Sequence, residues 1–346
     1  HNQQLTSSQS QKSSEANQVS SEANQVSLKK LNNNNMNNMN MNCTFSPELL
    51  AYTISALRKT RLETKPFPHV FVKGIFRESF YNCILAHLPR VRDTKKSYKM
   101  LKKGRYVIDV GEDDIYNRTA ATALDTTAKA PPPPPPYVPK PRKPRKGELS
   151  GVSPEIEQFW KDFKAMFGGE QMRNAWLKKF DKTVKLRRWP KEPKDKNTYH
   201  TKLDQFGYSM HLGRDLQEYQ VGPHTDTDNK WVTTLFYLPK ANTNTQLGTL
   251  VLQSASKKTA DDFKGRGALP RLQDPDFSVS TRARYVRNSV FAFAPCKSSW
   301  HAVGNVGQSA NSQKEARAIN RDTIQGFVRL MGVPKAVCPD PIKGKP

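Results

Sequence analysis

Apolar residues recur along this chain at two different periods. In the first half the spacing is helical, as in Phe80, Ile84 and Leu88. Ser-Pro-Glu, the usual start signal of a helix, occurs at both 46–48 and 153–155. The pattern predicts helices beginning near residues 47, 77 and 154, a further short helix over 172–180, and one early strand over 67–73.

From residue 208 onward the apolar period changes to two. Seven segments alternate in this way and are separated by turn-forming residues, so they are predicted as strands: 208–216, 218–221, 231–238, 248–253, 285–294, 300–306 and 321–330. A run of strands after a run of helices predicts an α+β fold. The strands should form a sandwich or barrel at the C-terminal end, with the helices flanking it.

Two segments are poor material for a core. Residues 1–42 are nearly all Ser, Gln, Asn, Lys and Met, which predicts a disordered tail. Six consecutive prolines at 131–136 lead into a basic, proline-rich stretch, which predicts polyproline II. The expected organisation is a tail over 1–45, a helix-and-strand part over 46–118, an insert over 119–150, the main domain over 151–335 and a short tail over 336–346.

The chain is strongly basic, with 56 Lys and Arg against 31 Asp and Glu in 346 residues. Residues 129–200 hold 18 of these cations and eight of the acids, so they carry +10 of the +25 formal charge. This excess predicts a polyanionic partner, or a partner that binds proline-rich motifs, at residues 129–200. The alternative is that these charges belong to a basic linker and a solvated helix face and bind no partner.

Apolar content and cysteine spacing set the expected environment. Hydrophobic residues make up 36% of the chain, and no apolar run approaches a membrane span. No signal peptide is seen, although the chain opens on His1 rather than Met. The four cysteines form no CxxC pair and are expected to be free thiols, so a cytoplasmic location is the default.

One motif in the strand region has the residue types of a metal-binding site. His224 and Asp226 are two residues apart, so at strand spacing their side chains point to the same face. A second histidine, His301, follows 77 residues later, after three predicted strands. Two imidazoles and one carboxylate on one face of an octahedral ion leave positions open, which is the facial triad of non-haem Fe(II) oxygenases.

A series of short segments in this region resembles the Fe(II)/2-oxoglutarate-dependent oxygenases, and within them the prolyl-4-hydroxylase-like group. The segments span about residues 208–330, and a weaker match extends upstream through Pro66-Phe-Pro-His-Val70 and Arg105-Tyr-Val-Ile108. They are Tyr219-Gln-Val-Gly-Pro-His224-Thr-Asp226, Thr234-Leu-Phe-Tyr-Leu-Pro239, Gly248-Thr249-Leu250, Asn288-Ser-Val-Phe-Ala-Phe-Ala294, Ser299-Trp-His301-Ala-Val303 and Arg321-Asp-Thr-Ile324. The family fold is a double-stranded β-helix, a jelly-roll, cupin-like sandwich, which agrees with the strand pattern.

The resemblance implies a ligand set and co-substrates. It assigns His224, Asp226 and His301 as Fe(II) ligands and as the catalytic centre, with 2-oxoglutarate and O₂ as co-substrates. Ascorbate is implied as a supporting reductant. Asp228 shares the face of Asp226 and is an alternative ligand.

The far carboxylate of 2-oxoglutarate would need a fixed cation, and Arg321 is the candidate, with the Thr323 hydroxyl beside it on the same strand face. Because Arg321 lies further from His301 than the family spacing, Arg317 stays an alternative. Tyr219 and Tyr237 are candidates for the lining of the co-substrate pocket. His211 is expected to be structural.

The activity that follows is oxidative decarboxylation of 2-oxoglutarate coupled to hydroxylation of a substrate. That substrate could be a protein or peptide residue such as proline, a small molecule, or a nucleic-acid base. The alternative function is a non-catalytic, basic scaffold, or a protein associated with nucleic acid or a particle, that retains an oxygenase-like fold. Metal binding discriminates between the two.

Overall fold

The computed structural model describes residues 43–89, 98–111, 149, 152–186, 206–227, 229–242, 244–263, 270–309 and 320–330. The chain divides into two units, 1–44 and 45–346. Residues 43 and 44 are the only described part of the first unit, so the predicted tail lies outside the described residues. The same holds for the proline-rich segment and for the C-terminal tail.

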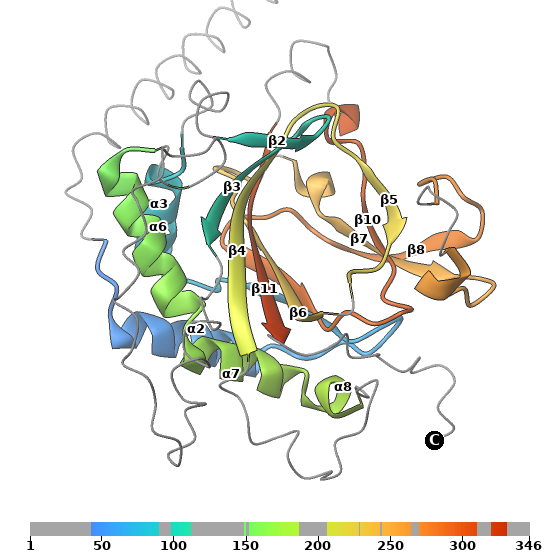
Figure 1. Cartoon of the computed structure of the whole chain (residues 1–346), viewed down its shortest axis with the longest axis horizontal. Coiled ribbons are helices and arrows are strands. Elements are labelled where there is room, and N and C mark those ends of the chain that lie inside the picture. The colour runs from blue at the N-terminus through green and yellow to red at the C-terminus, as the bar shows by residue number, and fades with distance from the viewer. Residues whose placement is uncertain are drawn as a thin grey trace, which may run out of the picture. The chain divides into compact units, whose positions relative to one another are not determined.

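The described part of the second unit contains two antiparallel sheets (Figure 1). The larger sheet has the order β1-β9-β6-β11-β4-β3-β2, and the smaller has the order β5-β10-β7-β8. The strands of the larger sheet are β1 (His69–Lys73), β9 (Ser289–Phe293), β6 (Lys230–Tyr237), β11 (Arg321–Leu330), β4 (Phe206–Asp215), β3 (Arg105–Gly111) and β2 (Lys99–Lys102). Those of the smaller are β5 (Val221–His224), β10 (His301–Val303), β7 (Thr249–Ser254) and β8 (Phe277–Ala283).

An apolar core lies between the two sheets. Leu235, Tyr237 and Phe291 of the larger sheet belong to one buried cluster with Val251 and Val303 of the smaller sheet. Because side chains alternate across a strand, the residues in register with these also face the space between the sheets. On β11 that inner face carries Arg321, Thr323, Gln325 and Phe327.

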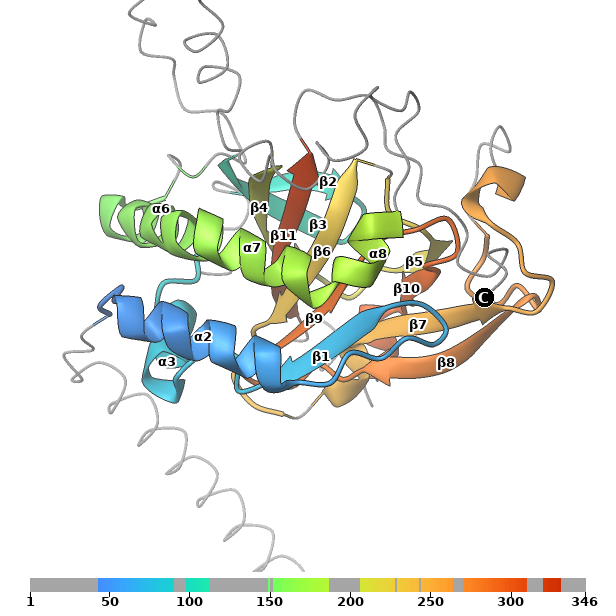
Figure 2. The same ribbon diagram turned by 90° about the horizontal axis from the view of Figure 1, so that it is seen from below.

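Helices cover the opposite face of the larger sheet (Figures 1 and 2). They are α2 (Pro47–Lys59), α3 (Glu78–Ala86), α6 (Pro154–Phe167), α7 (Glu170–Lys179) and α8 (Asp181–Leu186). Phe236 of β6 is the point of contact, since its ring lies 5.4 Å from Phe76 and 6.5 Å from Trp176, centroid to centroid. The helices therefore hold the larger sheet from outside and leave its inner face to the functional residues.

Local signals set the helix starts as predicted. The Ser46 hydroxyl accepts a hydrogen bond from the Leu49 amide at 3.3 Å, and Ser153 does the same for Ile156 at 3.4 Å. Each serine is followed by a proline whose missing N–H is not needed in the first turn. The prediction of helices followed by antiparallel strands is confirmed.

Several predicted boundaries are wrong. The strand expected over 218–221 is β5, which begins at Val221 and ends at His224, so it includes the first histidine of the candidate site. Strand β8 was not predicted, because most of its residues are exposed polar side chains of an edge strand. Strands β2 and β3 and helix α8 were not predicted from the apolar pattern either.

The expectation of free thiols is also wrong for two cysteines. Cys43 is disulfide-bonded and so is Cys83, whereas Cys296 is a buried thiol outside any disulfide. Sequence spacing gave no sign of this, because a disulfide depends on contacts between residues that are distant in the chain. No helix in the described part of the chain is both long and apolar enough to cross a membrane.

Candidate metal centre

Two neighbouring strands of the smaller sheet bring His224 and His301 together. His224 is the last residue of β5 and His301 the first of β10, and the two strands pair antiparallel with these residues directly opposite each other. The ring centroids are 4.1 Å apart. Two histidines that are 77 residues apart in the sequence therefore lie side by side on the same face of the sheet.

Both imidazoles are held in the same tautomer. The Nδ1–H of His224 donates to the Gly222 carbonyl at 2.9 Å, and that of His301 donates to the Ser299 carbonyl at 3.0 Å. A backbone carbonyl can only accept, so each Nε2 keeps its lone pair. Metal-binding histidines are commonly oriented by such a bond from the other ring nitrogen.

Burial keeps the two rings neutral. Burial, with a smaller contribution from His301, lowers the pKa of His224 to about 3. Burial also lowers the pKa of His301 below its ordinary value. A metal ligand must be unprotonated, so at neutral pH neither ring has to lose a proton before it can bind an ion.

The carboxylate of Asp226 lies beside this pair and is already engaged. Its Oδ1 is 2.6 Å from the Lys230 ammonium, and its Oδ2 accepts from the Thr233 hydroxyl at 2.6 Å. Burial would raise the pKa of Asp226, but Lys230 and the two histidines outweigh it and hold the pKa below its ordinary value. The carboxylate is therefore ionised and close enough to the histidines to interact with both.

The donor atoms of His224, His301 and Asp226 are of the types that Fe(II) binds, although the three side chains are not arranged in coordination geometry. Among the described residues no three His, Cys, Asp or Glu side chains are grouped so as to hold a metal. The two Nε2 atoms and the ionised carboxylate are the donors of a facial triad. Each carboxylate oxygen has a second lone pair, so it can bind a metal while it accepts a hydrogen bond.

Arg321 lies where the sequence places it, at the start of β11, but its guanidinium is engaged. It is 1% exposed, and its Nη1 donates to Asp215 Oδ2 at 2.6 Å. Its Nε donates to the Leu247 carbonyl at 2.7 Å, and its Nη2 is 3.4 Å from the Thr249 hydroxyl. Burial opposes its charge, yet Asp215 raises the pKa of Arg321 above its ordinary value.

A second arginine joins this cluster and was not singled out by its chemistry in the sequence. Arg105 of β3 lies opposite Asp215 in register, and its Nη1 is 3.3 Å from Asp215 Oδ1. The same nitrogen donates to the Tyr219 hydroxyl, which places Tyr219 in the cluster. Tyr237 lies at its edge, where its hydroxyl donates to Thr249 at 2.8 Å.

The remaining sequence candidates fall in three places. Thr323 is buried on the inner face of β11, one alternation after Arg321. His211 of β4 has its Nδ1 3.5 Å from Asp109 Oδ1, away from the histidine pair in sequence and strand. Asp228 and Arg317 lie outside the described residues.

The sequence did not single out Lys230 or Arg105, although both contact residues of the candidate site. Lys230 lies four residues after Asp226, a spacing typical of a helical ion pair, and only the turn before β6 brings its ammonium to the carboxylate. Arg105 was visible only as part of a family-like segment. Its role depends on β3 pairing with β4, a contact across 110 residues of chain.

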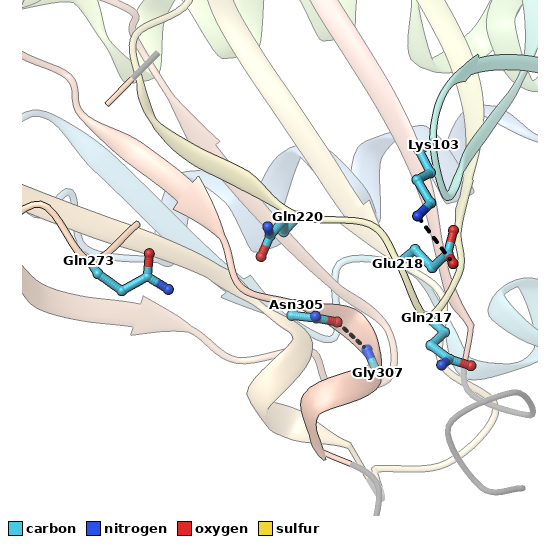
Figure 3. Close-up of a pocket in the computed structure, with 7 residues that line it drawn as sticks. All are labelled: Lys103, Gln217, Glu218, Gln220, Gln273, Asn305 and Gly307. Atoms are coloured by element: carbon cyan, nitrogen blue, oxygen red, sulfur yellow. Dashed lines mark hydrogen bonds and ion pairs between the residues drawn. The ribbon is translucent and has the colours of Figure 1, made fainter. Parts of the chain in front are cut away.

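An open pocket of about 540 Å³ lies at the other end of β5 and β10 (Figure 3). Gln220 precedes β5 and Asn305 follows β10, while both histidines lie at the opposite ends of these strands. Lys103 and Glu218 form an ion pair at 3.4 Å on its wall. The pocket is therefore separate from the histidine pair.

Comparisons with known proteins give only distant likenesses. No family model and no curated protein matches the sequence. Among solved structures, a prolyl-4-hydroxylase from Pseudomonas putida is 10% identical with a TM-score of 0.39, and the match covers 82% of this chain and all of that one. A 2-oxoglutarate-Fe(II) oxygenase family oxidoreductase from Burkholderia pseudomallei is 11% identical with a TM-score of 0.37, over 84% and 95% of the two chains.

A third structure, the Fe(II)/α-ketoglutarate-dependent dioxygenase TqaL, is 13% identical with a TM-score of 0.41, over 84% of this chain and 92% of that one. These structural neighbours are members of the 2-oxoglutarate-Fe(II) oxygenase family. Similarity at this level carries no information about function, which has to come from the residues themselves.

Proposed function

We propose that the chain is an Fe(II)- and 2-oxoglutarate-dependent oxygenase whose two sheets form a jelly-roll, double-stranded β-helix. The observation that carries the proposal is the histidine pair: His224 and His301 lie opposite each other, both neutral, both with Nδ1 held by a backbone carbonyl. His301 is buried and His224 partly buried, and each ring keeps an Nε2 lone pair that can bind a metal ion. Asp226 supplies the anionic donor that completes a facial triad.

Each residue of the centre has a defined task in this proposal. His224, His301 and Asp226 hold Fe(II), which supplies the oxidative chemistry when it is bound together with 2-oxoglutarate and O₂. The Gly222 and Ser299 carbonyls fix the imidazole orientation, and Thr233 fixes the carboxylate. The apolar core between the sheets excludes water from this space.

The reaction class is hydroxylation of a C–H bond coupled to conversion of 2-oxoglutarate to succinate and carbon dioxide. The substrates that we propose are a protein or peptide residue, such as proline, or a small molecule. The excess of Lys and Arg in the sequence of residues 129–200 would attract an acidic partner.

Succinate formation tests the proposal without knowledge of the substrate. We expect purified protein given Fe(II), 2-oxoglutarate and air to form succinate slowly, and His224→Ala and His301→Ala to abolish it. His87→Gln is the matched control, because His87 lies on the helical side, stacked on Phe159 at 4.0 Å. Absence of both metal binding and succinate in the wild type would refute the proposal.

A specific observation favours a second candidate, a non-catalytic protein that retains this fold. The Asp226 carboxylate is paired with Lys230, and no assembled three-residue metal group exists among the described residues. If the lysine permanently replaces the ion, equilibrium dialysis against Mn(II) will show no bound metal at micromolar concentrations. One bound ion per chain would remove this candidate.

A further inference from the structure

The open pocket of Figure 3 is lined by polar groups, and side-chain amides predominate among them. Its volume of about 540 Å³ lies within the range of small-molecule sites. Four of its seven lining residues carry a side-chain amide: Gln217, Gln220, Gln273 and Asn305. Of the other three, Lys103 and Glu218 form an ion pair and Gly307 has no side chain. The lining therefore offers hydrogen bonds and little else.

The lining of the pocket has no net charge, although the whole chain carries +25. Lys103 Nζ lies 3.4 Å from Glu218 Oε1, so the two charged side chains of the lining neutralise each other and leave no cation for an anionic ligand. None of the seven lining residues is aromatic or aliphatic, so an apolar ligand or a stacked base has nothing to pack against. The pocket is therefore suited to a neutral, polar ligand.

The side-chain amides of the lining are not engaged elsewhere. Within the part of the chain that the structure describes, those of Gln217, Gln220 and Gln273 make no hydrogen bond. Asn305 Oδ1 accepts from the Gly307 amide at 2.9 Å, and no described residue engages its NH₂ group. An amide presents two donors and an acceptor side by side, so a group that both donates and accepts can pair with it reciprocally.

Backbone hydrogen bonds hold the walls of the pocket together. The Leu216 amide donates to the Gly104 carbonyl at 2.7 Å, which joins the segment after β4 to the turn between β2 and β3. The Gly307 amide lies 3.0 Å from the Gln217 carbonyl, which joins the same segment to the one after β10. A Cβ at Gly104 would lie 2.5 Å from the Tyr219 amide nitrogen, so turn and wall are in close contact. Fixed walls lower the entropic cost of binding a ligand.

We propose that this pocket binds a neutral carbohydrate. Adjacent hydroxyl groups of a sugar each donate and accept, so they match a set of side-chain amides without requiring charge or apolar surface. A peptide is the less suitable ligand, because peptides gain affinity from main-chain bonds to an exposed strand edge. All seven lining residues lie in segments between strands.

The pocket is a binding site and not a second reaction site. Gln220 precedes β5 and is four residues from His224 at the far end of that strand. At roughly 3.3 Å per residue this distance is about 13 Å. A sugar held in the pocket is therefore away from the candidate metal centre, and the inference does not depend on the proposed function.

Two substitutions each remove one amide of the pocket, and a third provides a matched control. Gln220→Met and Gln273→Met keep the length of the side chain and remove its hydrogen-bonding groups. Both residues are exposed, so these variants should fold like the wild type. Gln253→Met is the control, because Gln253 is an exposed glutamine of β7 that does not line the pocket.

Binding is measured on the full chain by NMR, from the shifts of the side-chain NH₂ signals during titration with a neutral trisaccharide. The probes are maltotriose, cellotriose, mannotriose and chitotriose. Because no charge-assisted bond contributes, we expect at least one probe to bind with a Kd of about 1 mM. Gln220→Met and Gln273→Met should each weaken this binding about three- to tenfold, as expected for one lost hydrogen bond. Gln253→Met should change it by less than about twofold.

Several results would overturn the inference. If none of the four trisaccharides binds, or if Gln220→Met and Gln273→Met bind as tightly as Gln253→Met does, the pocket is not a carbohydrate site. Tighter binding of glucose 6-phosphate than of glucose would assign the pocket to an anion. Binding of N-acetyl-triglycine amide in the absence of trisaccharide binding would assign it to a peptide. The titration requires neither metal nor 2-oxoglutarate, so its failure leaves the oxygenase proposal unchanged.

Discussion

Replacing Lys230 by methionine should make the protein less stable without metal and a tighter binder of metal. The Lys230 ammonium is 2.6 Å from Asp226 Oδ1, and the two side chains are 15% and 11% exposed. The substitution keeps the length of the side chain and its contact with the Phe327 ring, over which the ammonium lies at 4.0 Å. What it removes is the only cation described at Asp226.

The size of the effect follows from burial. Removing one partner of a buried pair strands the other charge and costs about 3–5 kcal/mol. The Thr233 hydroxyl still donates to Asp226, so we expect the lower end, about 3 kcal/mol. A divalent ion at the histidine pair would supply the missing positive charge, and recovery of even half of the loss makes binding about tenfold tighter, at ~1.4 kcal/mol per decade.

A surface pair provides the control. Lys185 and Asp181 have the same four-residue spacing and a 2.7 Å contact, but their side chains are 54% and 48% exposed. Lys185→Met should change stability by less than about 0.5 kcal/mol. Urea unfolding with and without Mn(II), with calorimetric Mn(II) titration, measures both effects.

The reasoning would be refuted by a Lys230→Met variant that unfolds like the wild type and binds Mn(II) more weakly. That result would mean that Lys230 holds the carboxylate in place for the ion rather than competing with it.

Three further predictions concern stability. The pKa of His224 is about 3 in the folded chain and about 6.5 when unfolded, so the unfolded state binds more protons between these values. The free energy of unfolding of metal-free protein should therefore fall by up to about 1.4 kcal/mol per pH unit as the pH falls from 6.5 toward 3. His224→Gln should flatten this slope in urea titrations at several pH values. Asp215→Asn strands two buried guanidiniums and should cost about 3–5 kcal/mol in the same assay, whereas a loss below 1 kcal/mol would mean that the cluster is hydrated. Ser153→Ala removes the cap of α6 and should cost about 1 kcal/mol, with Ser153→Asp retaining stability.

Regular local patterns made much of the fold predictable. The last strand, 321–330, is predicted with its observed bounds, because Ile324 and Val328 face the helices and alternate with inward-facing residues such as Thr323 and Phe327. Strand β8 was invisible for the opposite reason. It is an edge strand with solvent on most of its length, so burial imposes no alternation on its sequence.

The site was predictable in its donors and not in its partners. His224, Asp226 and His301 stand out because metal chemistry restricts residue type and spacing. The pairing of Asp226 with Lys230 and of Arg321 with Asp215 and Arg105 depends on which strands become neighbours. These residues come from β3, β4 and β11, which are distant in the sequence. That two arginines share one aspartate is therefore visible only in the three-dimensional structure.

The central claim is that His224, Asp226 and His301 hold a divalent metal ion between the two sheets. A crystal grown with Mn(II) and 2-oxoglutarate, with anomalous data collected near the manganese edge, tests it directly. We predict one strong anomalous peak at coordination distance, about 2.0–2.3 Å, from both Nε2 atoms and an Asp226 oxygen. A well-ordered structure with no peak there, and with Asp226 still paired only with Lys230 and Thr233, would contradict the account.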